Sequence, residues 1–158
     1  MRLRLATLSD LDLIRRWDEE PHLEGTGGDP DWNEWDWENQ LGRTVAWREY
    51  LIAEVEGRPI GFLQIVDPKE EESHYWGECA PNLRAIDIWI GEAEMIGRGH
   101  GREMMSLAIE RCFADPAVTA ILIDPMACGA GCGPMGVSPI ALTLLGLHGL
   151  GRTRRRRR

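Results

Sequence analysis

Residues 87–105 read Asp87-Ile-Trp-Ile-Gly-Glu-Ala-Glu-Met-Ile-Gly97-Arg-Gly-His-Gly-Arg-Glu-Met-Met105. The apolar run that ends at Ile90 is typical of a strand, and Arg102 to Phe113 has an apolar face at helical spacing. Between them, the glycines of Gly97 to Gly101 permit a tight turn and let the backbone approach a ligand. The free N–H groups that open the following helix suit a pyrophosphate.

Two other interpretations of this glycine-rich turn remain open. A dinucleotide-binding turn would follow the first strand and would have an acidic residue about 20 positions later. Here the turn comes late, after a hairpin. A glycine-rich loop without any ligand would leave the same pattern.

The rest of the pattern predicts an α/β fold with a mixed central sheet flanked by helices. The glycine-rich turn lies at the carboxyl end of one of its strands. The predicted elements are a strand over Arg2–Ala6, cap residues over Thr7–Asp10, a helix over Leu11–Trp17, a hairpin of Leu51–Val55 and Ile60–Val66 joined by Glu56-Gly57-Arg58-Pro59, a strand over Ala85–Ile90, a helix over Arg102–Phe113 and a strand over Val118–Ile123.

Composition indicates one ordinary globular domain, because the chain has 158 residues, 43% of them hydrophobic and 28% charged. No apolar run reaches the roughly 20 residues that span a bilayer, and the first residues do not resemble a signal peptide. The four cysteines form no CxxC pair. We therefore expect a cytoplasmic protein with reduced thiols, no metal site and no membrane partner.

The net charge of −8 combines two different segments. All 26 acidic residues lie at or before Asp124, whereas six of the 18 basic residues lie beyond it. A strongly acidic body attracts cationic ligands and repels nucleic acid. This favours a cationic small-molecule substrate and no nucleic-acid partner, although acidity that only maintains solubility would look the same.

The glycine-rich turn resembles the acetyl-CoA pyrophosphate loop of the GNAT acetyltransferases, whose core is Gly-x-Gly before a helix. Ile96 stands where that family usually has Gln or Arg. Four further stretches are similar to the aminoglycoside 6′-N-acetyltransferase branch, and siderophore-precursor acyltransferases share parts of them. They are Pro81–Asp87, Leu107–Phe113, Asp115-Pro116 and Ile123-Asp124-Pro125. The resemblance covers residues 2–126.

This resemblance implies direct transfer of an acetyl group from acetyl-CoA, a co-substrate, to a deprotonated amine, without a metal. Backbone groups of Ile88, Trp89 and Ile90 would polarise the thioester carbonyl. The backbone of Gly97, Arg98, Gly99, His100 and Gly101 would hold the pyrophosphate. Asp87 matches the carboxylate that contacts the reacting amine in the aminoglycoside branch, where it can orient an ammonium and accept its proton. A structural bond from Asp87 to Arg84 or to a backbone amide is the alternative.

Four other residues are candidates for substrate binding. Asp124 could complete an acidic cleft, or could simply end a strand before Pro125. Trp32 and Trp35 belong to a tryptophan-rich acidic stretch, Pro21–Trp47, that could line a sugar site or be the core face of an irregular helix or loop. Glu72 lies in a loop that the resemblance places near substrate.

The resemblance ends near residue 126. After Asp124-Pro125 the family has an Asn, a helix with a tyrosine that protonates the departing thiolate, and two closing strands. Here no aromatic residue follows Phe113, and the chain ends in Arg154 to Arg158. We therefore expect an incomplete GNAT domain over 1–126, lacking the usual last helix and strands, and a poorly ordered tail over 127–158. A shifted reading frame would explain such a tail.

The first substrate hypothesis is the 6′-amine of an aminoglycoside, which would make the protein an antibiotic-resistance enzyme. An enzyme of the same fold acting on a siderophore precursor or a protein N-terminus is the first alternative. A catalytically impaired acyl-CoA-binding protein is the second, because the tyrosine region is missing.

Overall fold

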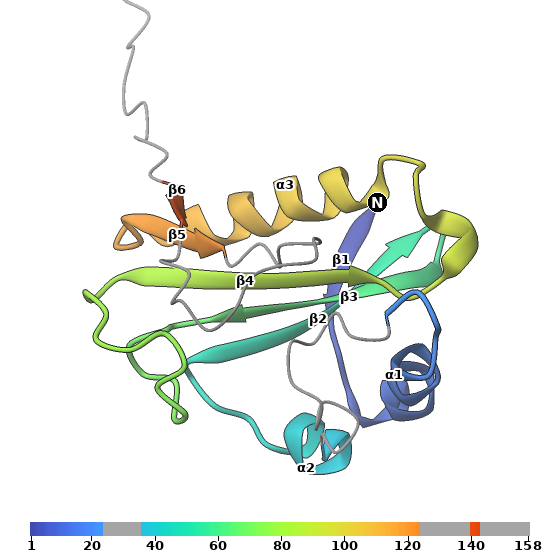
Figure 1. The fold of residues 1–158 in the computed structure, drawn as a ribbon, viewed down its shortest axis with the longest axis horizontal. Coiled ribbons are helices and arrows are strands. Elements are labelled where there is room, and N and C mark those ends of the chain that lie inside the picture. The colour runs from blue at the N-terminus through green and yellow to red at the C-terminus, as the bar shows by residue number, and fades with distance from the viewer. Residues whose placement is uncertain (24–35, 124–139, 143–158) are drawn as a thin grey trace, which may run out of the picture.

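The computed structural model describes residues 1–23 and 36–123 and the backbone of 140–142. Six strands form one sheet in the order β1-β2-β3-β4-β5-β6 (Figure 1). The elements are β1 (Arg2–Leu5), the 3-10 helix η1 (Leu8–Asp10), α1 (Leu11–Asp18), α2 (Trp37–Gly42), β2 (Arg48–Val55), β3 (Arg58–Val66), β4 (Leu83–Ile90), the 3-10 helix η3 (Ala93–Met95), α3 (His100–Phe113), β5 (Ala120–Ile123) and β6 (Ile140–Leu142).

The sheet is mixed, as the sequence predicts. Neighbouring strands run antiparallel except for β4 and β5, which are parallel. A parallel pair needs a crossover connection, and α3 supplies it. Figure 1 shows α3 across one face of the sheet, while α1 and α2 lie on the other. The glycine-rich turn leads from the end of β4 into α3.

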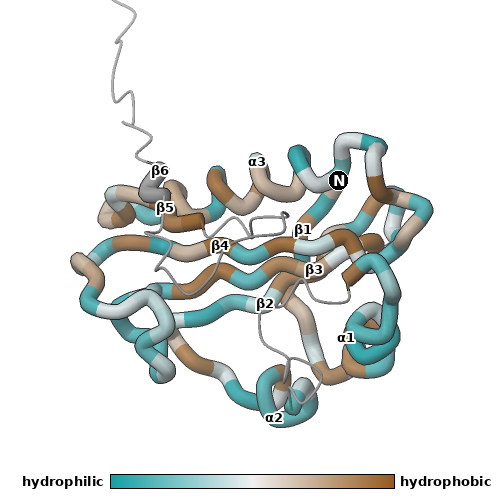
Figure 2. The backbone as a smooth tube through the Cα atoms, in the orientation of Figure 1, coloured by the Kyte–Doolittle hydropathy of each residue, from teal (hydrophilic) through white to brown (hydrophobic). Residues whose placement is uncertain are grey.

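Two groups of buried side chains hold these layers together. On the α3 face, Met104 and Ala108 of the helix are fully buried against Leu51 and Leu63 of the sheet. On the other face, Trp17 of α1 and the α2 residue Trp37 pack on the central strands with Phe62. Apolar stretches follow the central strands β2, β3 and β4 (Figure 2). These strands are therefore covered on both faces, which explains their long hydrophobic runs.

The β2–β3 hairpin is tighter than the sequence predicts. Glu56 and Gly57 both adopt positive φ, at 52° and 81°, so they form a two-residue turn. This geometry matches the twist of the flanking strands, and β3 begins at Arg58 rather than after Pro59. The pairing shifts at Ala53/Glu54, which leaves a bulge where proline is tolerated.

Two differences from the predicted elements concern the edges of the fold. Helix α2 was expected only as an irregular helix or loop, and β6 was not predicted at all. β6 pairs antiparallel with β5, inside the segment expected to be a tail. The expected domain boundary at residue 126 and the expected loss of the last helix fall on residues outside those described.

Candidate active site

The glycine-rich turn has the backbone that a ligand-binding loop requires. Gly97 and Gly99 adopt φ values of 73° and 85°, which favour glycine. A side-chain carbon placed at either would meet nothing within 4 Å, so the turn faces open space. The N–H groups of residues 97–102 donate no hydrogen bond to any acceptor in the described chain. Together with the start of α3 they can receive a pyrophosphate.

The half of β4 next to this turn has one open edge. β5 pairs with Leu83, Arg84 and Ala85 only. The remaining stretch, Ile86–Ile90, pairs with β3 on one side. On its other side no strand lies beside it in the described part of the chain.

The direction of the peptide groups along this edge follows from two contacts. The Gly91 N–H donates to the Ile60 carbonyl of β3 at 3.0 Å. On the opposite side, His22 Nε2 donates to the Ile90 carbonyl oxygen at 2.8 Å. Because successive residues of a strand point their polar groups to alternate edges, Ile88 and Ile90 present their N–H groups to the open edge. The neighbouring residue Trp89 directs its own N–H to β3.

Asp87 lies at the start of this open half. Its side chain points to the face opposite α3, since Ile86 and Ile88 pack on the α3 side. Gln64 of β3 stands directly opposite in register. Its Nε2 donates to Asp87 Oδ2 at 2.5 Å. The Asp87 carboxylate is thereby fixed by a neighbouring strand.

The alternative role of Asp87, a structural bond to Arg84, does not match the contacts of that arginine. Arg84 Nη1 donates to Asp67 Oδ2 at 2.9 Å, and its other nitrogen lies 3.5 Å from Asp115. Both contacts lie at the far end of β4 from the glycine-rich turn. Asp87 is therefore held by Gln64 rather than by the neighbouring cation.

Aromatic side chains surround Asp87 on its face of the sheet. The Trp89 ring stacks on Phe62 with centroids 4.5 Å apart. Trp37 of α2 meets Phe62 edge-on at 5.3 Å. Tyr50 is 7% exposed, and burial raises the pKa of its hydroxyl to about 12. The Asp87 side chain therefore shares its face of the sheet with packed aromatic side chains.

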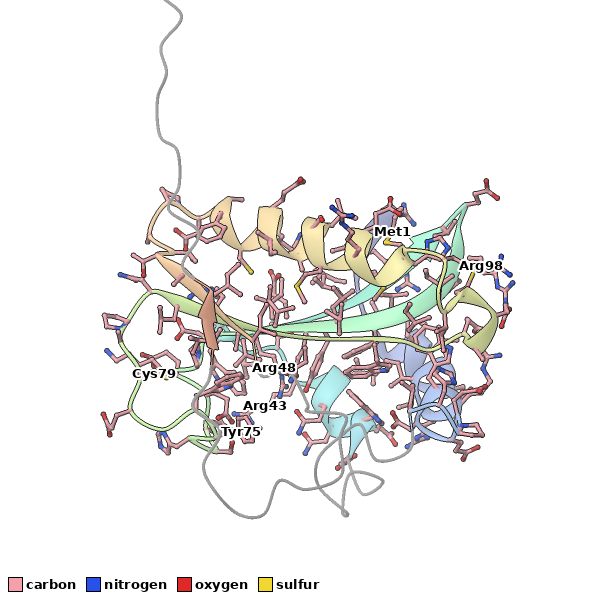
Figure 3. All side chains as sticks on the ribbon, turned by 45° about the horizontal axis from the view of Figure 1, so that its top comes forward. Met1, Arg43, Arg48, Tyr75, Cys79 and Arg98 are labelled. Carbon is pink, nitrogen blue, oxygen red and sulfur yellow. The ribbon has the colours of Figure 1, made fainter. Side chains whose placement is uncertain are left out.

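Glu72 lies in the β3–β4 loop, where its carboxylate forms an ion pair with both terminal nitrogens of Arg43. Figure 3 shows Arg43 near Arg48 and Tyr75, and Arg98 at the other end of the molecule. The Arg43 guanidinium lowers the pKa of the Glu72 carboxyl. Glu72 is therefore half of an exposed ion pair.

Three sequence-predicted substrate residues, Trp32, Trp35 and Asp124, lie outside the described residues. Among those described, no three His, Cys, Asp or Glu side chains group as they would around a metal ion. Cys112 lies on the buried face of α3, where burial raises the pKa of its thiol to about 11. The longest described helix, α3, has 14 residues, and no described helix could span a bilayer.

This arrangement agrees with a family match. The family model described as an acetyltransferase (GNAT) domain matches residues 6–130. The chain belongs to the GNAT acetyltransferase family. Membership accounts for the order of open strand, glycine-rich turn and helix described above.

Two kinds of curated relative resemble this GNAT chain. It is 32% identical over 131 residues to the aminoglycoside N(6′)-acetyltransferase type 1 of Klebsiella pneumoniae, covering 78% of this chain and 64% of that protein. It is 27% identical over 137 residues to the lysine N-acyltransferase MbtK of Mycobacterium tuberculosis, covering 78% and 60%. The chain therefore spans less than two thirds of the length of these relatives.

Solved structures agree with this fold. AAC(6′)-Ib in complex with ribostamycin and coenzyme A superimposes with a TM-score of 0.69 at 30% identity, covering 78% of this chain and 72% of that one. The same enzyme with coenzyme A and kanamycin gives 0.64 at 28% identity, covering 78% and 73%.

Two residues that contact the candidate site were missed by sequence reasoning. Gln64 could have been found, because it is a polar residue in the middle of the apolar strand β3. His22 has no such signal, since it follows α1 in a loop and reaches Ile90 only through the fold.

Proposed function

We propose that this protein transfers an acetyl group from acetyl-CoA to a primary amine. The observation that carries the proposal is the open half of β4. It spans Ile86–Ile90, includes Asp87, and is connected through η3 to the turn of Gly97–Gly101. The N–H groups of Ile88 and Ile90 along it suit the extended arm of acetyl-CoA, and the turn suits its pyrophosphate.

Each group has a defined task in this reaction. Acetyl-CoA supplies the activated acetyl group. The N–H groups at the open edge of β4 polarise the carbonyl by hydrogen bonding. Asp87 orients the substrate ammonium and accepts its proton, which frees the nitrogen lone pair. The new N–C bond forms as the C–S bond breaks, and the sulfur leaves as a thiolate that takes up a proton.

The first substrate class that we propose is an aminoglycoside, acetylated at its 6′-amine. The relatives named for that activity support it, as does the acidity of the chain. A polycationic sugar gains from negative charge near the site through long-range attraction. The relative named a lysine N-acyltransferase supports a second class, an amine of a siderophore precursor or of a protein terminus.

The test is release of thiol from acetyl-CoA in the presence of kanamycin, ribostamycin or L-lysine. We expect amine-dependent release that falls at least about a hundredfold in Asp87→Asn, the range that a general base contributes. Asp12→Asn, an exposed carboxylate on α1, is the matched control and should keep full activity. Release that does not depend on amine, or that survives in Asp87→Asn, would contradict the proposal.

Calorimetry with acetyl-CoA distinguishes an active acetyltransferase from a protein that only binds acyl-CoA. A protein that binds acetyl-CoA and acetylates none of the amines would be an acyl-CoA-binding member of the family. Binding that weakens when the turn is altered would still place the co-substrate at Gly97–Gly101.

A further inference from the structure

Gln64 is an exception within its strand. Gln64 is half-buried, whereas all the remaining residues of β3 from Gly61 to Val66 are buried. An amide in such surroundings is costly unless it is hydrogen-bonded. Its presence in an otherwise apolar stretch therefore needs a partner.

The register of β3 with its neighbouring strands identifies the partner of Gln64. Tyr50 of β2, Gln64 of β3 and Asp87 of β4 stand side by side across three strands. Their side chains share one face, the face opposite α3. Directly opposed side chains in antiparallel strands lie close enough to touch. The buried Tyr50 ring closes one side of Gln64, and the Asp87 carboxylate lies on the other.

The contact between Gln64 and Asp87 has a defined polarity. The distance from Gln64 Nε2 to Asp87 Oδ2 is 2.5 Å. An ionised carboxylate only accepts hydrogen bonds, so the amide must turn its NH₂ group toward Asp87. A hydrogen bond to a charged acceptor is shorter and stronger than one between neutral groups. Gln64 and Asp87 lie on neighbouring strands, β3 and β4, whose backbones pair at these two positions.

We propose that Gln64 is a positioning residue for acetyl transfer, holding the Asp87 carboxylate in the orientation in which it receives the substrate ammonium. This inference rests on the role proposed for Asp87. Gln64 itself does not contact the reacting atoms. It donates to one carboxylate oxygen and so fixes the rotation of the whole group.

Loss of this hydrogen bond should change the reaction rate in a way that loss of packing alone would not. An Asp87 carboxylate without its donor can rotate away from the amine, which lowers the rate of the step and leaves binding largely intact. The ionised form also loses a hydrogen bond that favours it. Both effects require Asp87 to be present.

The test is a cycle of variants. Gln64→Met keeps the size of the side chain and removes its donor. We expect kcat to fall about tenfold with KM within about twofold, since a positioning group acts on the bound complex. In Asp87→Asn the same change should cost less than about twofold, because Gln64 acts only through Asp87. Equal losses in both backgrounds, or a loss carried by KM alone, would overturn the inference.

Gln40→Met is the matched control. Gln40 lies on α2 and its side-chain oxygen is 3.4 Å from the Tyr50 hydroxyl. The same chemical change at this position should leave kcat unchanged. Gln64→Asn, which keeps an amide on a shorter chain, should restore part of the rate. If Gln40→Met slows the enzyme as much as Gln64→Met, the effect is structural and the inference is wrong.

A second measurement is independent of turnover. Carbon NMR of the Asp87 carboxyl group reports its titration in the full chain with and without Gln64→Met. We expect the pKa of Asp87 to be higher in the variant, because the charged form loses a donor. An unchanged titration would overturn the positioning role even in an active enzyme. A higher pKa in a protein that acetylates no amine would retain the contact and reject the proposed function.

Discussion

The indole ring of Trp17 lies directly on Gly91, with no room for a side-chain carbon between them. A carbon placed on Gly91 would lie 2.1 Å from Trp17 Cδ2. The same indole donates from Nε1 to Glu92 Oε1 at 3.0 Å. Helix α1 is thus fixed to the residues that directly follow the open half of β4.

Replacing Gly91 should therefore destabilise the protein. We expect Gly91→Ala to lower the free energy of unfolding by about 2 kcal/mol, in the range for overpacked cores. It should also raise KM for acetyl-CoA, because the end of β4 must shift. Chemical denaturation and steady-state kinetics measure the two effects. Gly42→Ala, at the end of α2 where an added carbon meets nothing within 4 Å, should leave both unchanged.

For the glycine-rich turn, two alanine variants can distinguish the effect of backbone strain from an effect on acetyl-CoA binding. Gly99 at φ 85° and Gly57 at φ 81° share a left-handed backbone and have open space around them. Alanine at either position should cost about 1 kcal/mol of stability. Only Gly99→Ala should weaken acetyl-CoA binding, by at least about tenfold in calorimetry, because it moves N–H groups that we propose to bind the pyrophosphate. Equal affinities in the two variants would exclude the turn as the binding site.

Local patterns were enough to predict most of this fold. The strands and α3 have strong apolar periodicity, and the hairpin has glycine in its turn, so each element is stable for reasons visible within a few residues. Helix α2 is different. It has six residues and is held mainly by Trp37 in the aromatic core, a contact that depends on the tertiary fold.

The candidate site likewise contains some residues that the sequence predicted and others that only the fold brings there. Gly97–Gly101 was predicted from one continuous stretch of sequence, and Asp87 from the resemblance of that stretch to the GNAT family. Gln64 and His22 come from 23 and 68 residues away. Which strand stands beside β4, and which loop reaches its end, depends on sheet order and not on local spacing. No pattern in this single sequence encodes those pairings.

The ion pair between Arg4 and Asp10 should make stability depend on pH. Asp10 is 6% exposed and accepts from Arg4 Nη2 at 2.6 Å. Hydrogen bonding from Arg4 holds the pKa of Asp10 below its usual value, so its contribution is present above the unfolded pKa and is lost as pH falls through the folded one. We expect Asp10→Asn to cost about 3 kcal/mol at pH 7, with the difference shrinking below about pH 4. Denaturation across pH measures it, and a cost that stays constant as pH falls from 7 through the acid range would contradict this account.

Asp18 should show the opposite dependence. Its Oδ2 accepts from the Trp37 indole, while its Oδ1 is buried without a donor in the part of the chain that the structure describes. Burial raises the pKa of Asp18, so its contribution to stability is present below the unfolded pKa and is lost as pH rises through the folded one.

Replacing Asp18 with a neutral isostere should then help at neutral pH. Asp18→Asn keeps an acceptor for Trp37 and removes the buried charge, so we expect a gain of about 1 kcal/mol at pH 7 and almost none at pH 4. Urea denaturation at the two pH values measures it, and Asp12→Asn on the exposed side of α1 is the control. A variant that is less stable at pH 7 would show that Oδ1 accepts a hydrogen bond in solution and that the charge is compensated.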